Sequence, residues 1–147
     1  MFHWHIGVLT NSIDSSMKAL QGLGVDTSRW LFGIADFSGD QTAVGTSGKL
    51  RSAVGRIGGV VYEFLEPLDD RSLQAAELKK KGPGIHHTAY VCDGYDDLER
   101  TVSEYLAAGG KKIWEVWHGA EHAYYVQAAD GSMIIELINC CPFMPEE

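Results

Sequence analysis

Two histidines and two glutamates stand inside short apolar segments typical of β-strands, where charged side chains are uncommon. They are His5, His87, Glu63 and Glu136. Charged residues are almost never fully buried unless they are paired or bind a metal. Two imidazoles and two carboxylates suit a divalent metal that prefers nitrogen and oxygen donors, such as zinc, nickel, cobalt, iron or manganese. The four residues are therefore a candidate metal site.

An internal repeat relates these residues to one another. HIGVLTNSIDSSMKAL (5–20) lines up with HTAYVCDGYDDLERTV (87–102), and each stretch opens with a histidine, continues as a strand and turns into a helix. VVYEFLE (60–66) lines up with MIIELIN (133–139), and each carries a glutamate within an apolar strand. Taken singly, a histidine is more often a hydrogen-bonded or surface residue, and a strand glutamate usually faces solvent. The recurrence of all four in both halves favours the metal site.

The stretch GPGIHHTAY (82–90) holds two adjacent histidines, of which only one can face the interior of a sheet. The repeat pairs His87 with His5, because HTAY matches HIGV. His86 then points the other way, where it packs or faces solvent. His87 is therefore the expected ligand.

A second group of polar residues lies in WHGAEH (117–122). His118 and His122 are four residues apart, but the segment has no His-Glu-x-x-His pattern, and Gly119 weakens a helix. The segment is interpreted as a loop. Loops near a site often carry substrate contacts, so His118, Glu121 or His122 either lines the pocket or is simply exposed.

Hydrophobic period and turn residues predict the same order of elements twice, a strand and a helix followed by three strands. In the first half the expected strands are 2–9, 29–37, 50–57 and 60–67, with a helix over 12–24 and a loop over 38–48. In the second half they are 85–92, 111–117, 122–130 and 132–139, with a helix over 95–110. Residues 72–82 are expected to form a short helix or linker. Two such βαβββ units can place one histidine and one glutamate each on a shared concave face.

Composition bounds the class of protein. The chain has 147 residues, 45% of them apolar and 22% charged, which is an ordinary globular balance. Its net charge of −8 argues against nucleic acid as a partner. Three cysteines without a signal peptide indicate a reduced, cytoplasmic protein. No apolar run approaches the roughly 18 residues that a membrane span needs, so no membrane association is expected.

Three segments resemble a known family. They are EFLEPLDDRS (63–72), KKKGPGIHHTAYVCDGYDDLE (79–99) and DGSMIIELIN (130–139). Together they resemble the vicinal oxygen chelate superfamily, which includes glyoxalase I, methylmalonyl-CoA epimerase, extradiol dioxygenases and bleomycin-resistance proteins. The Leu-Glu-Pro segment, the Gly-x-Gly-Ile-His-His strand and the closing Ile-Glu-Leu look most like the epimerase branch.

The resemblance implies an α+β fold in which two βαβββ modules form a cupped mixed sheet around one metal site. It implies a single domain over 1–147, with module one at about 1–68, a linker helix at about 70–83 and module two at about 84–140. The metal ligands would be His5, Glu63, His87 and Glu136. Family members usually dimerise, so a homodimer that binds a small-molecule substrate is expected.

The resemblance also implies a reaction. Epimerases and glyoxalase I both remove a proton next to a carbonyl and stabilise the enolate on a divalent metal, here zinc, nickel, cobalt or manganese. Glu136 or Glu63 would act as the base. Epimerases usually carry Gln at the position of Glu63, and two His with two Glu look more like glyoxalase I. The alternatives are therefore a glyoxalase I-type lactoylglutathione lyase and a non-enzymatic binding or resistance protein.

Overall fold

The structure is a computed structural model that describes residues 1–37, 41–44 and 48–147, with the backbone alone for 41–44. Its strands are β1 (Phe2–Leu9), β2 (Leu31–Asp36), β3 (Gln41–Val44), β4 (Lys49–Ile57), β5 (Val60–Pro67), β6 (Gly84–Val91), β7 (Lys111–His118), β8 (Glu121–Gln127) and β9 (Ile134–Ile138). Its helices are α1 (Ile13–Gly22), α2 (Leu73–Lys81) and α3 (Gly94–Ala107).

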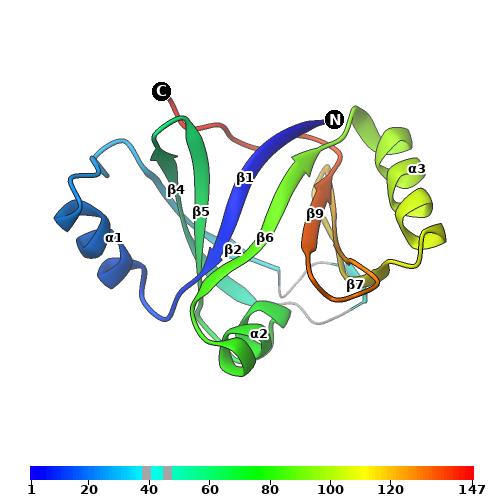
Figure 1. Ribbon diagram of the computed structural model, residues 1–147, viewed down its shortest axis with the longest axis horizontal. Helices are drawn as coiled ribbons and strands as arrows, with labels where there is room; N and C mark the ends of the chain where they lie inside the picture. The colour runs from blue at the N-terminus through cyan, green and yellow to red at the C-terminus, as the bar shows by residue number, and fades with distance from the viewer. Residues whose placement is uncertain (38–40, 45–47) are drawn as a thin grey trace.

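These nine strands form one mixed sheet in the order β2-β4-β5-β1-β6-β9-β8-β7-β3. β1 and β6 pair antiparallel at its centre, and each pairs in parallel with the last strand of its own half, β5 or β9. Outward from the centre, β1-β5-β4-β2 and β6-β9-β8-β7 follow the same pattern. Figure 1 shows the sheet curling, with α1 and α3 on opposite flanks and α2 between the halves. The expected α+β fold with a cupped mixed sheet is confirmed.

The prediction of a loop over residues 38–48 is wrong for residues 41–44. Gln41–Val44 form strand β3, which pairs antiparallel with β7 at the far end of the sheet from β2. The segment thus leaves the β2 side of the cup and joins the β7 side. A strand of four residues is too short to show the alternation of apolar and polar side chains from which strands are predicted. It is held in the sheet by backbone pairing. Residues 38–40 and 45–47 lie outside the described part of the chain.

The loop expected over 117–122 is instead a tight hairpin. β7 continues to His118 and β8 begins at Glu121, and these two residues pair across the strands. Only Gly119 and Ala120 form the turn, and Gly119 has a φ of 59°, which favours glycine. The polar residues of this segment are therefore held on strands and not on a loop.

Each half has its own helix-covered core. On α1, the buried Ile13 and Met17 pack with Trp30. On α3, the buried Leu98 and Val102 pack with aliphatic and aromatic residues of β8 and β9. The helices pack on the outer face of the sheet through these stripes, which leaves the inner, concave face available for a site.

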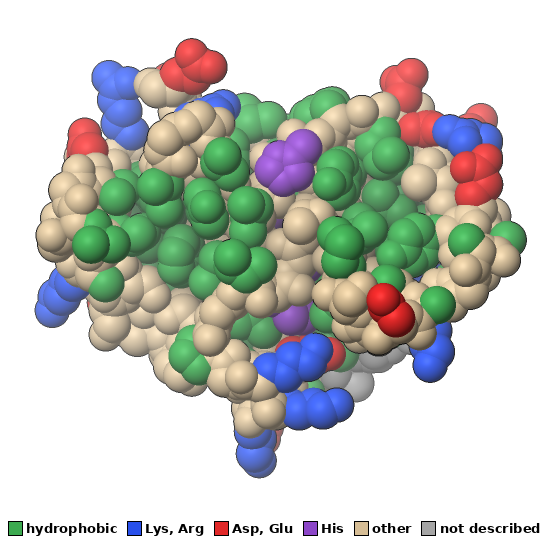
Figure 2. All heavy atoms as spheres, viewed as in Figure 1, with side chains coloured by type: hydrophobic (Ala, Val, Ile, Leu, Met, Phe, Trp, Pro, Cys, Tyr) green, Lys and Arg blue, Asp and Glu red, His purple; other side chains and the backbone are tan. Residues whose placement is uncertain are grey.

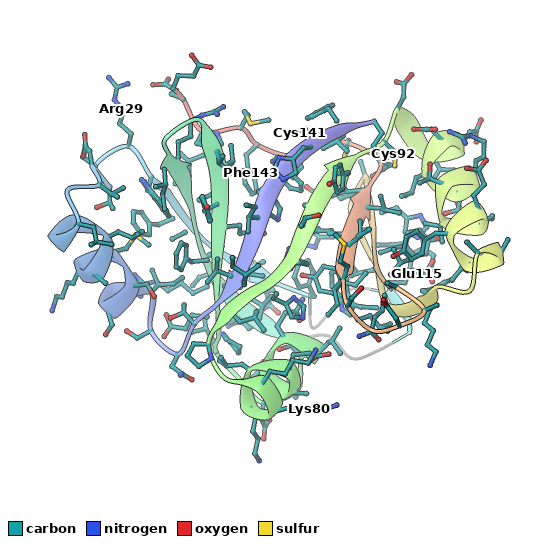
Figure 3. The ribbon with its side chains drawn as sticks, viewed as in Figure 1. Arg29, Lys80, Cys92, Glu115, Cys141 and Phe143 are labelled. Atoms are coloured by element: carbon teal, nitrogen blue, oxygen red, sulfur yellow. The ribbon has the colours of Figure 1, made fainter. Side chains whose placement is uncertain are left out.

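The C-terminal segment crosses the centre of the molecule. After β9 the chain runs back over β1, where Figure 3 shows Phe143 beside that strand. The indole Nε1 of Trp4 donates a hydrogen bond of 3.0 Å to the carbonyl oxygen of Phe143, and the two rings pack 5.1 Å apart. The segment therefore closes one side of the cup.

The outer surface is mixed in character. Figure 2 shows hydrophobic side chains gathered over both halves of one face, with charged side chains mainly at its margins. Among the described residues, no helix combines the length and the apolar character that crossing a membrane requires.

Candidate metal centre

Four neighbouring strands at the centre of the sheet bring His5, Glu63, His87 and Glu136 together. The histidines lie on β1 and β6, and the glutamates on β5 and β9. Glu63 pairs with Gly7, which is two residues after His5 on β1. In the same way, Glu136 pairs with Ala89, which is two residues after His87 on β6. Because side chains alternate along a strand, this register puts all four on one face. One ligand atom from each lies within 4.8 Å of the other three.

The contacts within the cluster are short and buried. Nε2 of His5 lies 2.9 Å from Oε2 of Glu63 and 3.3 Å from Oε2 of Glu136. Nε2 of His87 lies 3.1 Å from Oε2 of Glu136 and 3.3 Å from Nε2 of His5. The two histidine side chains are fully buried, whereas those of Glu63 and Glu136 are 13% and 11% exposed. The carboxylates thus form the part of the cluster that reaches solvent.

The close packing of imidazole and carboxylate shifts two pKa values in opposite directions. Burial alone would lower the pKa of His5, but the charge of Glu63 and hydrogen bonds to both glutamates raise it from 6.5 to about 10. Burial would raise the pKa of Glu136, but hydrogen bonds from His5 and His87 lower it from 4.5 to about 2. The cluster therefore attracts positive charge strongly.

His86 supports the cluster from outside it. Its Nδ1 lies 3.0 Å from Nδ1 of His87. Burial first, and then the neighbouring His87, lower the pKa of His86 from 6.5 to about 3, so its ring is neutral near pH 7. A neutral His86 can accept the Nδ1–H of His87, which leaves the Nε2 lone pair of His87 directed at the cluster.

Gly7 also shapes the site, although this role was not predicted from its sequence position. A Cβ atom on Gly7 would lie 2.0 Å from Cε1 of His87, so the imidazole packs directly on the glycine backbone. A glycine inside a strand often marks such a close approach, which was the available sequence signal. Trp4, which lies at a register shift between His3 and His5, also lines the cavity beside the cluster.

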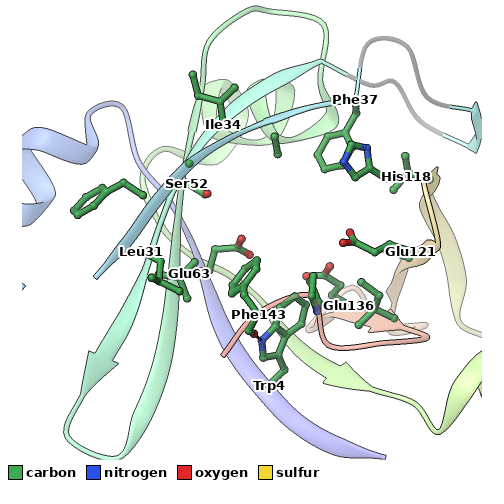
Figure 4. Close-up of a pocket in the computed structure, with 18 of the residues that line it drawn as sticks. Trp4, Leu31, Ile34, Phe37, Ser52, Glu63, His118, Glu121, Glu136 and Phe143 are labelled. Carbon is green, nitrogen blue, oxygen red and sulfur yellow. Dashed lines mark hydrogen bonds between the residues drawn. The ribbon is translucent and has the colours of Figure 1, made fainter. Parts of the chain in front are cut away.

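A cavity of about 390 Å³ opens beside the cluster. Glu63 and Glu136 line it, and Figure 4 shows both carboxylates together with Trp4 and Phe143 around the opening. The remaining lining is mostly apolar and comes from β2 and the residue Phe37 after it, from β4, β7, β8 and β9, and from the segment after β9. This volume suits a small molecule that would meet the two carboxylates at one end.

The WHGAEH residues divide between two faces. His118 and Glu121 line the cavity, and Figure 4 shows both side chains directed toward it. His122 lies on the opposite face, stacked against Trp117 with its Nε2 2.9 Å from Oε1 of Glu115. His122 therefore has a packing role, and the pocket interpretation holds for the other two.

A family model matches residues 4–127, and its description is the glyoxalase/bleomycin resistance protein/dioxygenase superfamily. The chain therefore belongs to this superfamily, as its resemblance to the vicinal oxygen chelate proteins predicted. No curated protein matches the chain in sequence.

Solved structures agree on the fold. A hypothetical protein of Bacillus halodurans C-125 is 23% identical with a TM-score of 0.66, over 99% of this chain and 98% of its own. Methylmalonyl-CoA epimerase of Mycobacterium tuberculosis is 21% identical with a TM-score of 0.67, over 95% and 88%. A point variant of the Streptomyces coelicolor methylmalonyl-CoA epimerase, in complex with 2-nitronate-propionyl-CoA, is 18% identical with a TM-score of 0.64, over 99% and 97%. At these identities the similarity establishes the fold.

Proposed function

We propose that this protein is a metal-dependent isomerase or epimerase that removes a proton next to a carbonyl of a small, thioester-type substrate. The observation that carries the proposal is the cluster of two buried histidines and two partly exposed glutamates at the end of a small-molecule cavity. The likeness to methylmalonyl-CoA epimerases supports the reaction class at low identity.

The donor set fits a divalent metal. Four nitrogen and oxygen atoms converge from four strands, and the two histidine Nε2 atoms face each other at 3.3 Å, each with a carboxylate oxygen within 3.1 Å. Zinc, nickel, cobalt or manganese accepts such ligands. Held by His5, Glu63, His87 and Glu136, the ion would polarise a substrate carbonyl as a Lewis acid.

Glu63 is the better candidate for the catalytic base. It contacts one histidine of the cluster, His5, whereas Glu136 contacts both His5 and His87. Glu136 is thus held in place from two sides, and Glu63 has more freedom to turn toward a carbon in the cavity. A base needs to come within hydrogen-bond reach of the proton it removes. We assign proton transfer to Glu63 and the anchoring of the cluster chiefly to Glu136, which sets this chain apart from epimerases that carry Gln at the position of Glu63.

The first experiment is the metal content of the untagged protein beside that of a His87→Ala variant. About one transition metal per chain is expected in the wild type, and the variant should lose it because one of four ligands is gone. Absence of metal after exposure to zinc, nickel, cobalt and manganese would reject the site and leave a binding protein as the better interpretation.

The second experiment separates the two glutamates. Glu63→Gln keeps a side-chain oxygen beside His5, so it should retain most of the metal and lose exchange of the α-proton of a 2-substituted malonyl-CoA in D₂O, by about 10²–10⁴-fold. Glu136→Gln removes the carboxylate that contacts both histidines, so it should bind the metal more weakly than Glu63→Gln. Full exchange in both variants would reject a carboxylate base from this cluster.

A glyoxalase I-type lyase is the second candidate, and the two-histidine, two-glutamate cluster favours it. Turnover of the hemithioacetal of methylglyoxal and glutathione, measured beside the malonyl-CoA thioester, distinguishes the two reactions.

A further inference from the structure

One wall of the cavity is apolar apart from Glu63 at the cluster and Ser52 of β4. It starts at the cluster with Glu63, which pairs with Val54 of β4, and Val54 in turn pairs with Leu31 of β2. Four residues further along the same strands, the paired residues are Leu50 and Ala35. This wall therefore offers the cluster at one end and only apolar side chains at the other.

The opposite wall has the same register but a different far end. Glu136 pairs with Tyr125 of β8, and Tyr125 pairs with Trp114 of β7. Four residues further along, the paired residues are Glu121 and His118, both of which line the cavity. They occupy the positions that Leu50 and Ala35 occupy in the first wall. At these matching positions, the first half therefore has two apolar residues and the second half has two polar ones.

The spacing sets the length of what fits between the two polar ends. Four residues along a strand span about 13 Å, and the side chains at each end shorten the gap. Between them on this wall lie Val116, Ala123 and Ile138, all apolar. The ring of Phe37 closes the far end, with its centre 5.3 Å from that of His118. The gap suits an apolar body of about the size of one ring.

The charge of the cavity is one-sided. Three glutamates line it, and none of its described lining residues is lysine or arginine. The sequence of residues 38–47 contains no lysine or arginine either. A divalent ion at the cluster would offset two of the glutamates, and Glu121 is then the acidic side chain that lines the far end. An anionic group placed there would meet the Glu121 carboxylate, and no lysine or arginine among the described lining residues.

We propose that Glu121, with His118 beside it, recognises the far end of the substrate and selects its charge. The substrate class is a small molecule with an oxygen-bearing head at the cluster, an apolar body, and a far end that is cationic or donates hydrogen bonds. Molecules with a carboxylate at the far end are rejected. The inference rests on the proposed metal site for the head group.

Three matched probes test it without turnover. They are benzohydroxamates with a 4-aminomethyl, a 4-methyl or a 4-carboxylate group, titrated calorimetrically into the zinc-loaded protein. The shared hydroxamate chelates zinc and the ring fills the apolar gap, so only the far end differs. The aminomethyl probe should bind tightest and the carboxylate probe weakest, with about tenfold between them, as expected for one partly buried charge interaction.

Variants at Glu121 supply the control. Glu121→Gln should reduce the preference to near unity, and Glu121→Lys should reverse it. Glu104→Gln, an exposed change on α3, should leave the order unchanged. Circular dichroism checks that each variant is folded. If Glu121→Lys does not fold, Glu121→Gln decides the test.

The two proposals fail in different ways. Equal binding of the three probes to the wild type, with binding lost in His87→Ala, would keep the metal site and overturn the selection by Glu121. An unchanged preference in Glu121→Gln would overturn it as well. Failure of all probes to bind the zinc-treated protein, or equal binding by His87→Ala, would overturn the metal site and this inference with it.

Discussion

The position of His87 depends on a neighbour that has no side chain. Its ring packs on Gly7, where an added Cβ would lie 2.0 Å from Cε1. Gly7→Ala should therefore displace the imidazole, and we expect the protein to lose most of its metal. Gly55→Ala is the matched control, because its Cβ would meet the ring of Trp30 at 2.1 Å, away from the cluster.

Both glycine variants are expected to be less stable, each by about 1–3 kcal/mol, since an added methyl overpacks a buried ring. Metal content per folded chain, measured after gel filtration, tells them apart. If Gly55→Ala lost as much metal as Gly7→Ala, the loss would reflect general destabilisation and not the position of His87.

At the residue scale, the sequence indicated the candidate ligands because a repeat placed them at matching positions. His5, Glu63, His87 and Glu136 do converge. What the sequence did not indicate was their support, such as the contact between His86 and His87. That contact depends on rotamers and on local distortion of the strands, and neither leaves a periodic signal.

At the scale of elements, α2 links the two halves of the sheet to the site. Its N-cap residue Ser72 is buried, and its side chain accepts a hydrogen bond of 3.0 Å from the backbone N–H of Ala75. In the same first turn, Nε2 of Gln74 donates a hydrogen bond of 3.2 Å to the hydroxyl of Tyr125, and the ring of Tyr125 packs 4.8 Å from that of His87. The capped helix therefore supports the residues beneath the cluster.

Ser72→Ala should lower the free energy of unfolding by about 1 kcal/mol, because one N–H of the first turn loses its partner. Ser103→Ala, an exposed change within α3, should alter it by less than about 0.5 kcal/mol. Urea unfolding followed by circular dichroism measures both. Equal stability of Ser72→Ala and the wild type would mean that the cap does not hold α2 in place.

Elements with a strong periodicity of hydrophobic residues could be predicted from the sequence. Elements fixed by backbone pairing could not. The clearest pattern, over 95–110, is helix α3, and the hairpin around Gly58 and Gly59 joins β4 to β5 as expected. Strand β3 was missed, and so were the end of β7 at His118 and the start of β8 at Glu121. Their pairing partners lie on other strands, so the deciding interactions are absent from the local sequence.

At the scale of the whole molecule, the cluster links stability to pH when no metal is bound. The pKa of His5 is raised to about 10, so its contribution is fully present below its unfolded value of 6.5 and is lost as the pH rises through 10. The pKa of Glu136 is lowered to about 2, so its contribution is present above 4.5 and is lost as the pH falls through 2. The metal-free protein should gain most from the cluster between about pH 4.5 and 6.5.

Urea unfolding of chelator-treated protein from pH 5 to 9.5 measures this dependence. The wild type should lose stability toward pH 9.5, and His5→Gln should show a flatter profile because it has no proton to lose there. The same slope in both proteins would assign the pH dependence to groups outside the cluster.

The sheet order also bears on assembly. β2 is the end strand of the sheet, and it exposes Leu31, Phe32 and Ile34 by 45%, 53% and 64%. An apolar edge strand is a ready template for pairing with another chain. This edge leads us to predict a homodimer that pairs through β2.

Ile34→Lys should therefore shift the chain toward a monomer in sedimentation velocity, because it places a charge in the interface. Ile85→Lys is the matched control, since Ile85 is 73% exposed on β6, at the centre of the sheet. It should leave the dimer intact. Ile34 also lines the cavity, so metal content is measured on the same samples to show that the site survives. A wild type that is monomeric at all concentrations would overturn the dimer, and an Ile34→Lys variant that remains dimeric would place the interface elsewhere.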